Sequence, residues 1–219
     1  MYYDPRKNDH GLPHSPFTAI VVPRPIGWIS SVSRDGVVNL APYSFFNMIS
    51  GYPPFVMFSS NPRKHSQTNA EETGEFVANL ATWDLREEVN ASSAEFGPGV
   101  SEPERVGLEM VPCREVKVPR VARSPVAIEC KYSKTVELFG SDGKRNPSSV
   151  VIGEAVGVHI DDDLIVNGHV DVTRMKPIAR LGYMDYCVVE DFFTIHRPAA
   201  PDDDTAPEDT HEIATNRRR

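Results

Sequence analysis

The 219-residue sequence has few of the features that mark several common protein classes. Its three cysteines, Cys113, Cys130 and Cys187, contain no Cys-x-x-Cys pair, which excludes a zinc knuckle and a thioredoxin-like motif. We interpret them as reduced, packed thiols. No run approaches the roughly 20 apolar residues of a membrane helix, and the N-terminus lacks the apolar segment of a signal peptide. We therefore expect a cytoplasmic protein that does not enter a membrane.

The sequence also lacks a net positive charge and the usual catalytic signatures. The formal net charge of −8 argues against a nucleic-acid surface, which needs a basic stripe. The sequence has no GxGxxG, P-loop, GxSxG or HExxH motif. We interpret His159 as a structural strand residue rather than a metal ligand or a base. No catalytic side chain and no metal site are expected.

Short apolar runs between prolines and glycines indicate a mainly antiparallel β domain. Asp35-Gly36 predicts a hairpin turn, and Pro42 should end the strand that follows it because proline has no ladder donor. The order of elements lacks a βαβ rhythm, so a doubly wound fold is not expected. The predicted strands are 26–33, 37–41, 55–59, 75–81, 126–138, 150–160 and 186–189.

Two helices and one long excursion complete the predicted domain. Thr68 and Glu71 have capping-box spacing and Gly74 is placed as a stop, which predicts a short helix that begins at Thr68. A second helix is predicted over 84–94. The segment 97–125 is rich in proline and charge, which is typical of a lid or an interface arm. The expected layout is an N-terminal arm at 1–15, a domain at 16–197 and a disordered acidic tail at 198–219.

The segment between the third predicted strand and the first helix combines hydroxyls, cations and a helix N-terminus. It contains Ser59, Ser60, Arg63 and Lys64, with Thr68 close behind. A helix N-terminus offers unpaired N–H groups and partial positive charge, which suit a phosphate. Arg63 can add a forked contact and Lys64 a point charge. A capped helix with two solvated basic residues explains the same spacing, and both interpretations stay open.

A second unusual stretch, 39–47, leaves a hairpin strand through Pro42 into aromatic and amide-bearing residues. Backbone groups in such a bend can hydrogen-bond a flat heterocycle while Phe45 and Phe46 form its walls. Ordinary core packing followed by a turn is the alternative. The residues alone do not decide between the two.

These stretches together resemble the flavin reductase-like, FMN-binding split-barrel family. The similarity extends from about Pro16 to Pro198 and depends on the order and spacing of the motifs. The sequence departs from many members at 65–67, where an acidic residue commonly precedes the threonine, and it has no Gly-Asp-His motif near its C-terminus. The matching segments are 23–33, 35–36, 39–47, 53–54, 59–64, 68–69, 73–80, 152–156 and 177–186.

The resemblance implies a mainly β fold with peripheral helices, a Greek-key antiparallel split barrel over 16–197. It also implies a homodimer with FMN near the subunit interface. The isoalloxazine ring would lie against Ser30, Ser31, Ser44, Phe45, Phe46 and Asn47. The phosphate would lie against Ser59, Ser60, Arg63, Lys64 and Thr68. Asn69 completes the implied cofactor-binding residues, with Arg180 as a weaker match whose alternative role is to brace the subunit interface.

The leading functional hypothesis is an NAD(P)H:flavin reductase that transfers hydride from a reduced nicotinamide to N5 of bound FMN. Flavin carries such chemistry itself, which fits the missing catalytic signatures. One alternative is a flavoredoxin-like electron carrier without its own nicotinamide activity. Another is a flavin-free module that holds a different phosphate ligand. A redox protein or a monooxygenase is the expected kind of protein partner.

Overall fold

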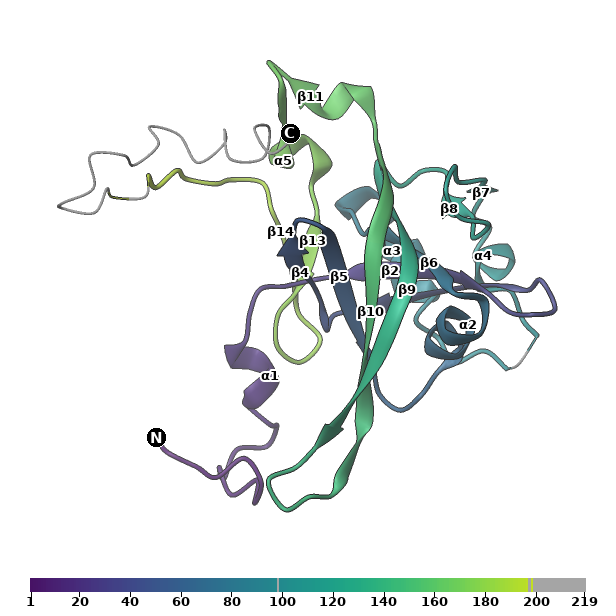
Figure 1. Cartoon of the computed structure of the whole chain (residues 1–219). Helices are drawn as coiled ribbons and strands as arrows, with labels where there is room; N and C mark the ends of the chain where they lie inside the picture. Colours follow the sequence, from purple (N-terminus) through teal and green to yellow (C-terminus); the bar gives the residue numbers. More distant parts are fainter. Residues whose placement is uncertain (98, 197, 199–219) are drawn as a thin grey trace.

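The protein is built around a seven-stranded antiparallel sheet, seen in the computed structural model of Figure 1. The structure describes residues 1–97, 99–196 and 198. The strand order is β3-β2-β6-β9-β10-β5-β4, and each neighbouring pair is antiparallel. The mainly β fold is therefore confirmed. The strands are β2 Gly27–Val32, β3 Val38–Tyr43, β4 Phe46–Gly51, β5 Pro54–Ser60, β6 Glu75–Leu80, β9 Val126–Phe139 and β10 Arg145–Ile160.

The two outermost strands of this sheet are consecutive in the chain. β3 ends at Tyr43 and β4 begins at Phe46, so only Ser44 and Phe45 separate the two edges. Such a connection spans at most about 11 Å between the Cα atoms of Tyr43 and Phe46. The sheet must therefore curl until its edges meet, which makes it a barrel. The stretch 39–47 lies at this seam.

The remaining elements lie around the barrel (Figure 1). A three-stranded sheet has the order β1-β13-β14, and two small ribbons pair β7 with β8 and β11 with β12. Among the described residues, none of the helices has both the length and the apolar character that a membrane crossing requires. The strands are β1 Arg24–Pro25, β7 Met110–Val111, β8 Arg120–Val121, β11 Ile165–Val166, β12 His169–Val170, β13 Ile178–Arg180 and β14 Tyr186–Val188. The helices are α1 Phe17–Ile20, α2 His65–Thr73, η1 Trp83–Leu85, α3 Arg86–Ala91, α4 Glu102–Arg105, η2 Asp162–Leu164 and α5 Val172–Met175.

Aromatic side chains from strands that are not adjacent in the sheet meet in the core. Phe58 and Phe76 are fully buried and meet edge to face, with ring centroids 5.4 Å apart. Gly153 on β10 leaves room for this packing, because a Cβ there would lie 2.4 Å from the Phe76 ring. Trp28 is also fully buried, and its indole N–H donates to Ser92 Oγ at 2.9 Å. That bond fixes the end of α3 to the barrel.

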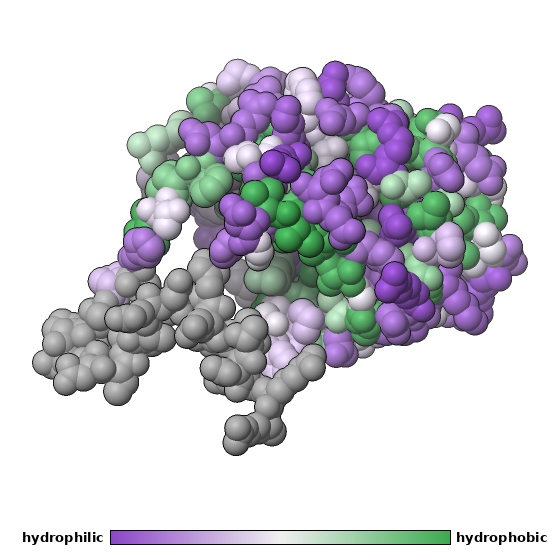
Figure 2. Space-filling view, turned by 90° about the horizontal axis from the view of Figure 1, so that it is seen from above, coloured by the Kyte–Doolittle hydropathy of each residue, from purple (hydrophilic) through white to green (hydrophobic). Residues whose placement is uncertain are grey.

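The long hairpin of β9 and β10 extends beyond the body of the barrel (Figure 1). Its far end exposes Val136, Leu138 and Phe139. In the view from above, apolar residues form several separate green patches among polar ones (Figure 2). The turn of this hairpin lies at 140–144, and β10 begins directly after it at Arg145, five residues before the predicted strand start at 150.

Several predicted boundaries need correction. The first long helix begins at His65, so Thr68 lies inside α2 and is not its cap, whereas Gly74 ends the helix in the left-handed region at φ 77°. Pro42 does not end β3, because its missing donor is tolerated on an edge strand. Strand β4 was not predicted. The second helix is shorter than 84–94, with η1 followed by α3. All but the first residue of the predicted tail lies outside the described residues.

Candidate functional site

The candidate site is the corner where β5 leads into α2. Lys64 is the N-cap residue of α2, and no side chain caps the first turn of this helix. The first hydrogen bond along the helix runs from Thr68 N to Lys64 O at 3.1 Å. The amide groups of the first turn are therefore available to a ligand, and an N-terminus of this kind attracts anions.

Arg63 is held in place beside this helix end. Its Nε donates to Thr68 Oγ1 at 3.1 Å, and its guanidinium lies 2.5 Å from Glu71 Oε2. Glu71 also accepts from Gln67 Nε2 at 2.9 Å and from Thr135 Oγ1 at 2.7 Å. Burial acts to raise the pKa of Glu71, but these donors outweigh it and the net shift is downward. Glu71 thus stays ionised and orients a half-exposed Arg63.

Lys64 is less constrained. Its ammonium lies 3.8 Å from Glu95 Oε1, and the Glu95 side chain is 90% exposed. An ion pair this long and this exposed contributes little to stability. Lys64 is therefore free to turn toward an anionic ligand.

A cavity of about 400 Å³ opens against this corner. Its lining combines the basic corner with polar and aromatic side chains from β3, the end of α3 and α4. This composition suits a ligand that has both an anionic group and a flat, partly apolar body. The lining residues are Asn39, Ala41, Tyr43, Pro62, Arg63, Lys64, His65, Ser66, Thr68, Ser92, Ser93, Ala94, Glu95, Phe96 and Glu102.

A buried polar network forms one wall of the cavity. Glu102 is 5% exposed, and its Oε2 accepts from the Leu40 backbone N–H at 3.1 Å. The Asn39 amide bridges the Glu102 carboxyl at 3.1 Å and the Ser66 hydroxyl at 2.8 Å. Burial raises the pKa of Glu102 above its ordinary value. Helix α4, inside the excursion predicted at 97–125, therefore helps to build the site.

Tyr43 carries a buried hydroxyl group. Its side chain is 7% exposed, and its hydroxyl lies near the hydroxyls of Ser60 and Ser66 without a well-aligned hydrogen bond to either. Burial raises the pKa of Tyr43 and keeps it neutral. Since unpaired buried hydroxyls are costly, this oxygen is suited to bond a ligand.

The ring-binding residues predicted in 44–47 lie at the barrel seam, outside the cavity lining. Phe45 is exposed, with the Arg24 guanidinium 5.8 Å from its ring centroid. Phe46 packs near Gly27 and is half-buried, as is Ser44. Asn47 is exposed and accepts from the Met48 N–H at 2.9 Å. A flat ligand would have to extend from the cavity to the seam to meet them.

Ser30, Ser31, Ser59, Ser60 and Asn69 do not line the cavity. Ser30 Oγ donates to Pro119 O at 2.7 Å, and Asn69 Nδ2 donates to Ser31 Oγ at 3.1 Å. Ser60 Oγ donates to Pro62 O at 2.8 Å. Ser59 is half-buried, and its N–H donates to Phe45 O at 2.8 Å. These polar groups are therefore engaged within the protein.

Arg180 lies on β13, away from the cavity lining. Its guanidinium is 4.5 Å from the Tyr186 ring centroid and donates to the Tyr186 hydroxyl and to Tyr183 O. It therefore fastens the loop between β13 and β14. The structure brings together Arg63, Lys64 and Thr68 of the predicted set.

Comparison with known proteins identifies the family. The flavin reductase like domain matches residues 19–176, which is more than half of the chain. The chain belongs to the flavin reductase-like family. Its fold is the FMN-binding split barrel, as the resemblance implied.

Three solved structures illustrate the similarity. Nitrilotriacetate monooxygenase component B from Bacillus cereus is 28% identical with a TM-score of 0.82, over 89% of this chain and 98% of that one. The 2-nitrobenzoate 2-nitroreductase NbaA of Pseudomonas fluorescens is 32% identical with a TM-score of 0.73, over 83% and 88%. The flavoredoxin of Desulfovibrio vulgaris (Miyazaki F) shares the fold at 20% identity, with a TM-score of 0.71 over 80% and 91%.

Proposed function

We propose that the protein is an FMN-dependent oxidoreductase that acts as an NAD(P)H:flavin reductase. The observation that carries the proposal is the cavity of about 400 Å³ in which Arg63, Lys64 and the uncapped N-terminus of α2 converge. Two cations and a helix end suit a phosphate dianion. Family membership and the similarity to monooxygenase component B and the 2-nitroreductase support the assignment.

The residues of the cavity fit FMN, and each has a definable task. Arg63, oriented by Glu71 and Thr68, offers its remaining N–H groups to the phosphate, and Lys64 adds a second charge. The unpaired Tyr43 hydroxyl is available to a polar edge of the ring. The predicted ring contacts at Ser44–Asn47 line the seam beside the cavity. FMN, when bound, supplies the hydride and electron chemistry, and the protein supplies position and electrostatics.

The proposal includes a homodimer in the cytoplasm, with a redox protein or a monooxygenase as a further partner. Edge strand β4 exposes Met48 and Ile49, and the end of the β9–β10 hairpin exposes Phe139. Apolar groups on an edge strand and on a projecting hairpin favour association with a second copy. Light scattering should give about twice the chain mass of 24.3 kDa. A monomer would contradict the dimer.

FMN titration, followed by quenching of flavin fluorescence, tests the binding step. Arg63→Gln should weaken FMN binding about 10- to 100-fold, because it removes a charge-assisted contact worth roughly 1.5–3 kcal/mol. The matched control is Arg34→Gln, since Arg34 is an exposed arginine paired with Glu72 at 3.4 Å and lies outside the cavity lining. Equal affinity in both variants would refute the phosphate corner. If the wild-type protein does not bind FMN, both flavin hypotheses are wrong, and the flavin-free module that holds another phosphate ligand remains.

Anaerobic mixing with NADH or NADPH tests the reductase step. Flavin bound to wild-type protein should bleach faster than free FMN at the same concentration. If the bound flavin bleaches no faster than free FMN, the reductase assignment is wrong. That result would favour an electron carrier like the flavoredoxin that shares the fold. Comparison of the two nucleotides identifies the donor.

A further inference from the structure

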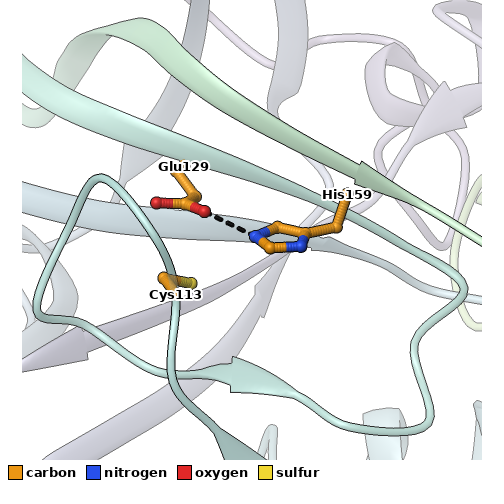
Figure 3. A group of neighbouring side chains, drawn as sticks. All are labelled: Cys113, Glu129 and His159. Carbon is orange, nitrogen blue, oxygen red and sulfur yellow. Dashed lines mark hydrogen bonds and ion pairs between the residues drawn. The ribbon is translucent and has the colours of Figure 1, made fainter.

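A second group of reactive side chains lies outside the candidate flavin site. Cys113, Glu129 and His159 place one sulfur, one oxygen and one nitrogen atom within 4.8 Å of one another (Figure 3). The three come from the excursion, from β9 and from β10. None of them lines the cavity of the candidate flavin site.

An irregularity in the pairing of β10 with β9 brings Glu129 and His159 together. Ala155 is opposite Cys130, but Gly157 is opposite Glu129, so β10 advances two residues while β9 advances one. A bulge of this kind shifts which residues of a strand share a face with the partner strand. Because of the bulge, His159 lies on the same face as Glu129. Without it, Val158 would take that place.

Glu129 is a buried and highly ordered carboxylate. It is 1% exposed, and the backbone N–H groups of Arg114, Glu115 and Val116 donate to it at 3.0, 2.6 and 3.0 Å. Its Oε1 also lies 2.5 Å from His159 Nε2 (Figure 3). A Cβ at position 157 would lie 3.1 Å from Glu129 Cδ, so the glycine gives the carboxylate room.

We propose that Cys113, Glu129 and His159 form a binding site for a divalent transition-metal ion, with Zn²⁺ the best match. Thiolate, imidazole and carboxylate are the ligand types that Zn²⁺ takes. One thiolate and one carboxylate cancel its two positive charges, so the half-buried complex is neutral. The backbone donors on Glu129 hold the ligand oxygen in position as outer-shell contacts do in metal sites.

The surroundings leave space for the fourth ligand and for the adjustment that an ion requires. A cavity of about 380 Å³ borders the cluster and is lined by both Glu129 and His159. Two arginines, Arg114 and Arg120, face it together with three carboxylates, those of Glu115, Glu129 and Asp161, so the lining favours a cation. Metal–ligand bonds of about 2.0–2.3 Å need wider ligand spacing than the present hydrogen bond. His159 lies at the cavity side and can turn to provide it, and water can fill the open position.

The bound ion would fasten the excursion to the barrel. Cys113 directly precedes the backbone segment 114–116 that Glu129 binds, and β9 and β10 provide the other two ligands. The ion therefore cross-links three segments that are remote in the sequence.

Zinc titration of untagged, metal-stripped full-length protein by calorimetry tests the site, with zinc X-ray absorption to identify the ligands. The expected result is one Zn²⁺ per chain with one sulfur in its coordination sphere. Cys113→Ser and His159→Gln should each lower the affinity at least about 10-fold. The matched control is Cys187→Ser, which changes a half-buried thiol outside the cluster and should leave affinity unchanged.

Three results would each overturn the proposal: no stoichiometric Zn²⁺ binding, a zinc coordination sphere without sulfur, or equal Zn²⁺ affinity in the Cys113 and Cys187 variants. Circular dichroism of each variant verifies that lost binding is not lost folding. Because FMN binding is measured independently, failure of the metal site leaves the proposed flavin function untouched.

Discussion

The phosphate corner and the Cys113–Glu129–His159 cluster are assembled in opposite ways. In the corner, Arg63, Lys64 and Thr68 lie within six positions of one another and are arranged by one helix end. In the cluster, the three residues are spread over 47 positions, from 113 to 159, and meet only through strand pairing and a bulge. The corner is half-exposed and charged, whereas the cluster is centred on a buried carboxylate.

This difference determines what a substitution does in each place. The corner is held by a few local hydrogen bonds, and its cations are solvated, so its variants should lose ligand and keep their fold. Glu129 accepts hydrogen bonds from the backbone N–H groups of Arg114, Glu115 and Val116. Its variants should therefore lose stability.

The largest effect is expected for Glu129→Ala. The substitution leaves the N–H of buried Val116 unpaired, whereas the N–H groups of Arg114 and Glu115 belong to exposed residues and can turn to water. Because an unpaired buried donor costs about 1–3 kcal/mol, the free energy of unfolding should fall by about 2 kcal/mol in urea denaturation at pH 7. The control is Glu137→Ala, where the exposed carboxylate pairs with Arg145 and the change should stay within about 0.5 kcal/mol. A similar loss of stability in both variants would mean that Glu129 is no more important to the fold than an exposed glutamate.

Tyr43→Phe should separate binding from stability. The hydroxyl is buried without a partner, so its removal should leave the free energy of unfolding unchanged or slightly higher. FMN affinity should fall about 10-fold, the effect of one lost hydrogen bond of about 1.4 kcal/mol. Thermal denaturation and FMN titration of the same preparation measure both. A destabilised variant with unchanged affinity would mean that the hydroxyl has a structural partner.

The same contrast explains which parts were predictable from the sequence. Charges and turn residues close together, such as Arg63, Lys64 and Gly74, have local consequences: the helix stop at Gly74 is confirmed, and Arg63 and Lys64 do lie beside a helix N-terminus. The strand runs around Phe58 and Phe76 predicted β5 and β6 because apolar runs of that length are typical of buried strands. The closure of the sheet into a barrel was predicted only from the resemblance to the split-barrel family.

The sequence did not reveal the roles of residues whose surroundings come from distant segments of the chain. Glu102 reaches the cavity only because α4 packs on β3, and no local pattern distinguishes it from an exposed glutamate. His159 was interpreted as a strand residue, which is true of its backbone, but the bulge near Gly157 decides what it faces. Thr68 was assigned as a cap although the helix extends to His65, because Thr-x-x-Glu spacing also occurs inside a helix. Glu71, the supposed capping partner, instead orients Arg63.

The smallest effect is expected for Glu95→Gln, at the rim of the corner. Its carboxylate lies 3.8 Å from Lys64 Nζ in an exposed pair, so stability should change by less than about 0.5 kcal/mol. Removal of a negative charge from the cavity lining should strengthen FMN binding about two- to threefold at low salt, and screening should erase the gain at high salt. FMN titrations at two salt concentrations measure this. Weaker FMN binding in Glu95→Gln would mean that Glu95 orients Lys64, as Glu71 orients Arg63. The geometry of the corner would then depend on a residue outside the segment 63–68.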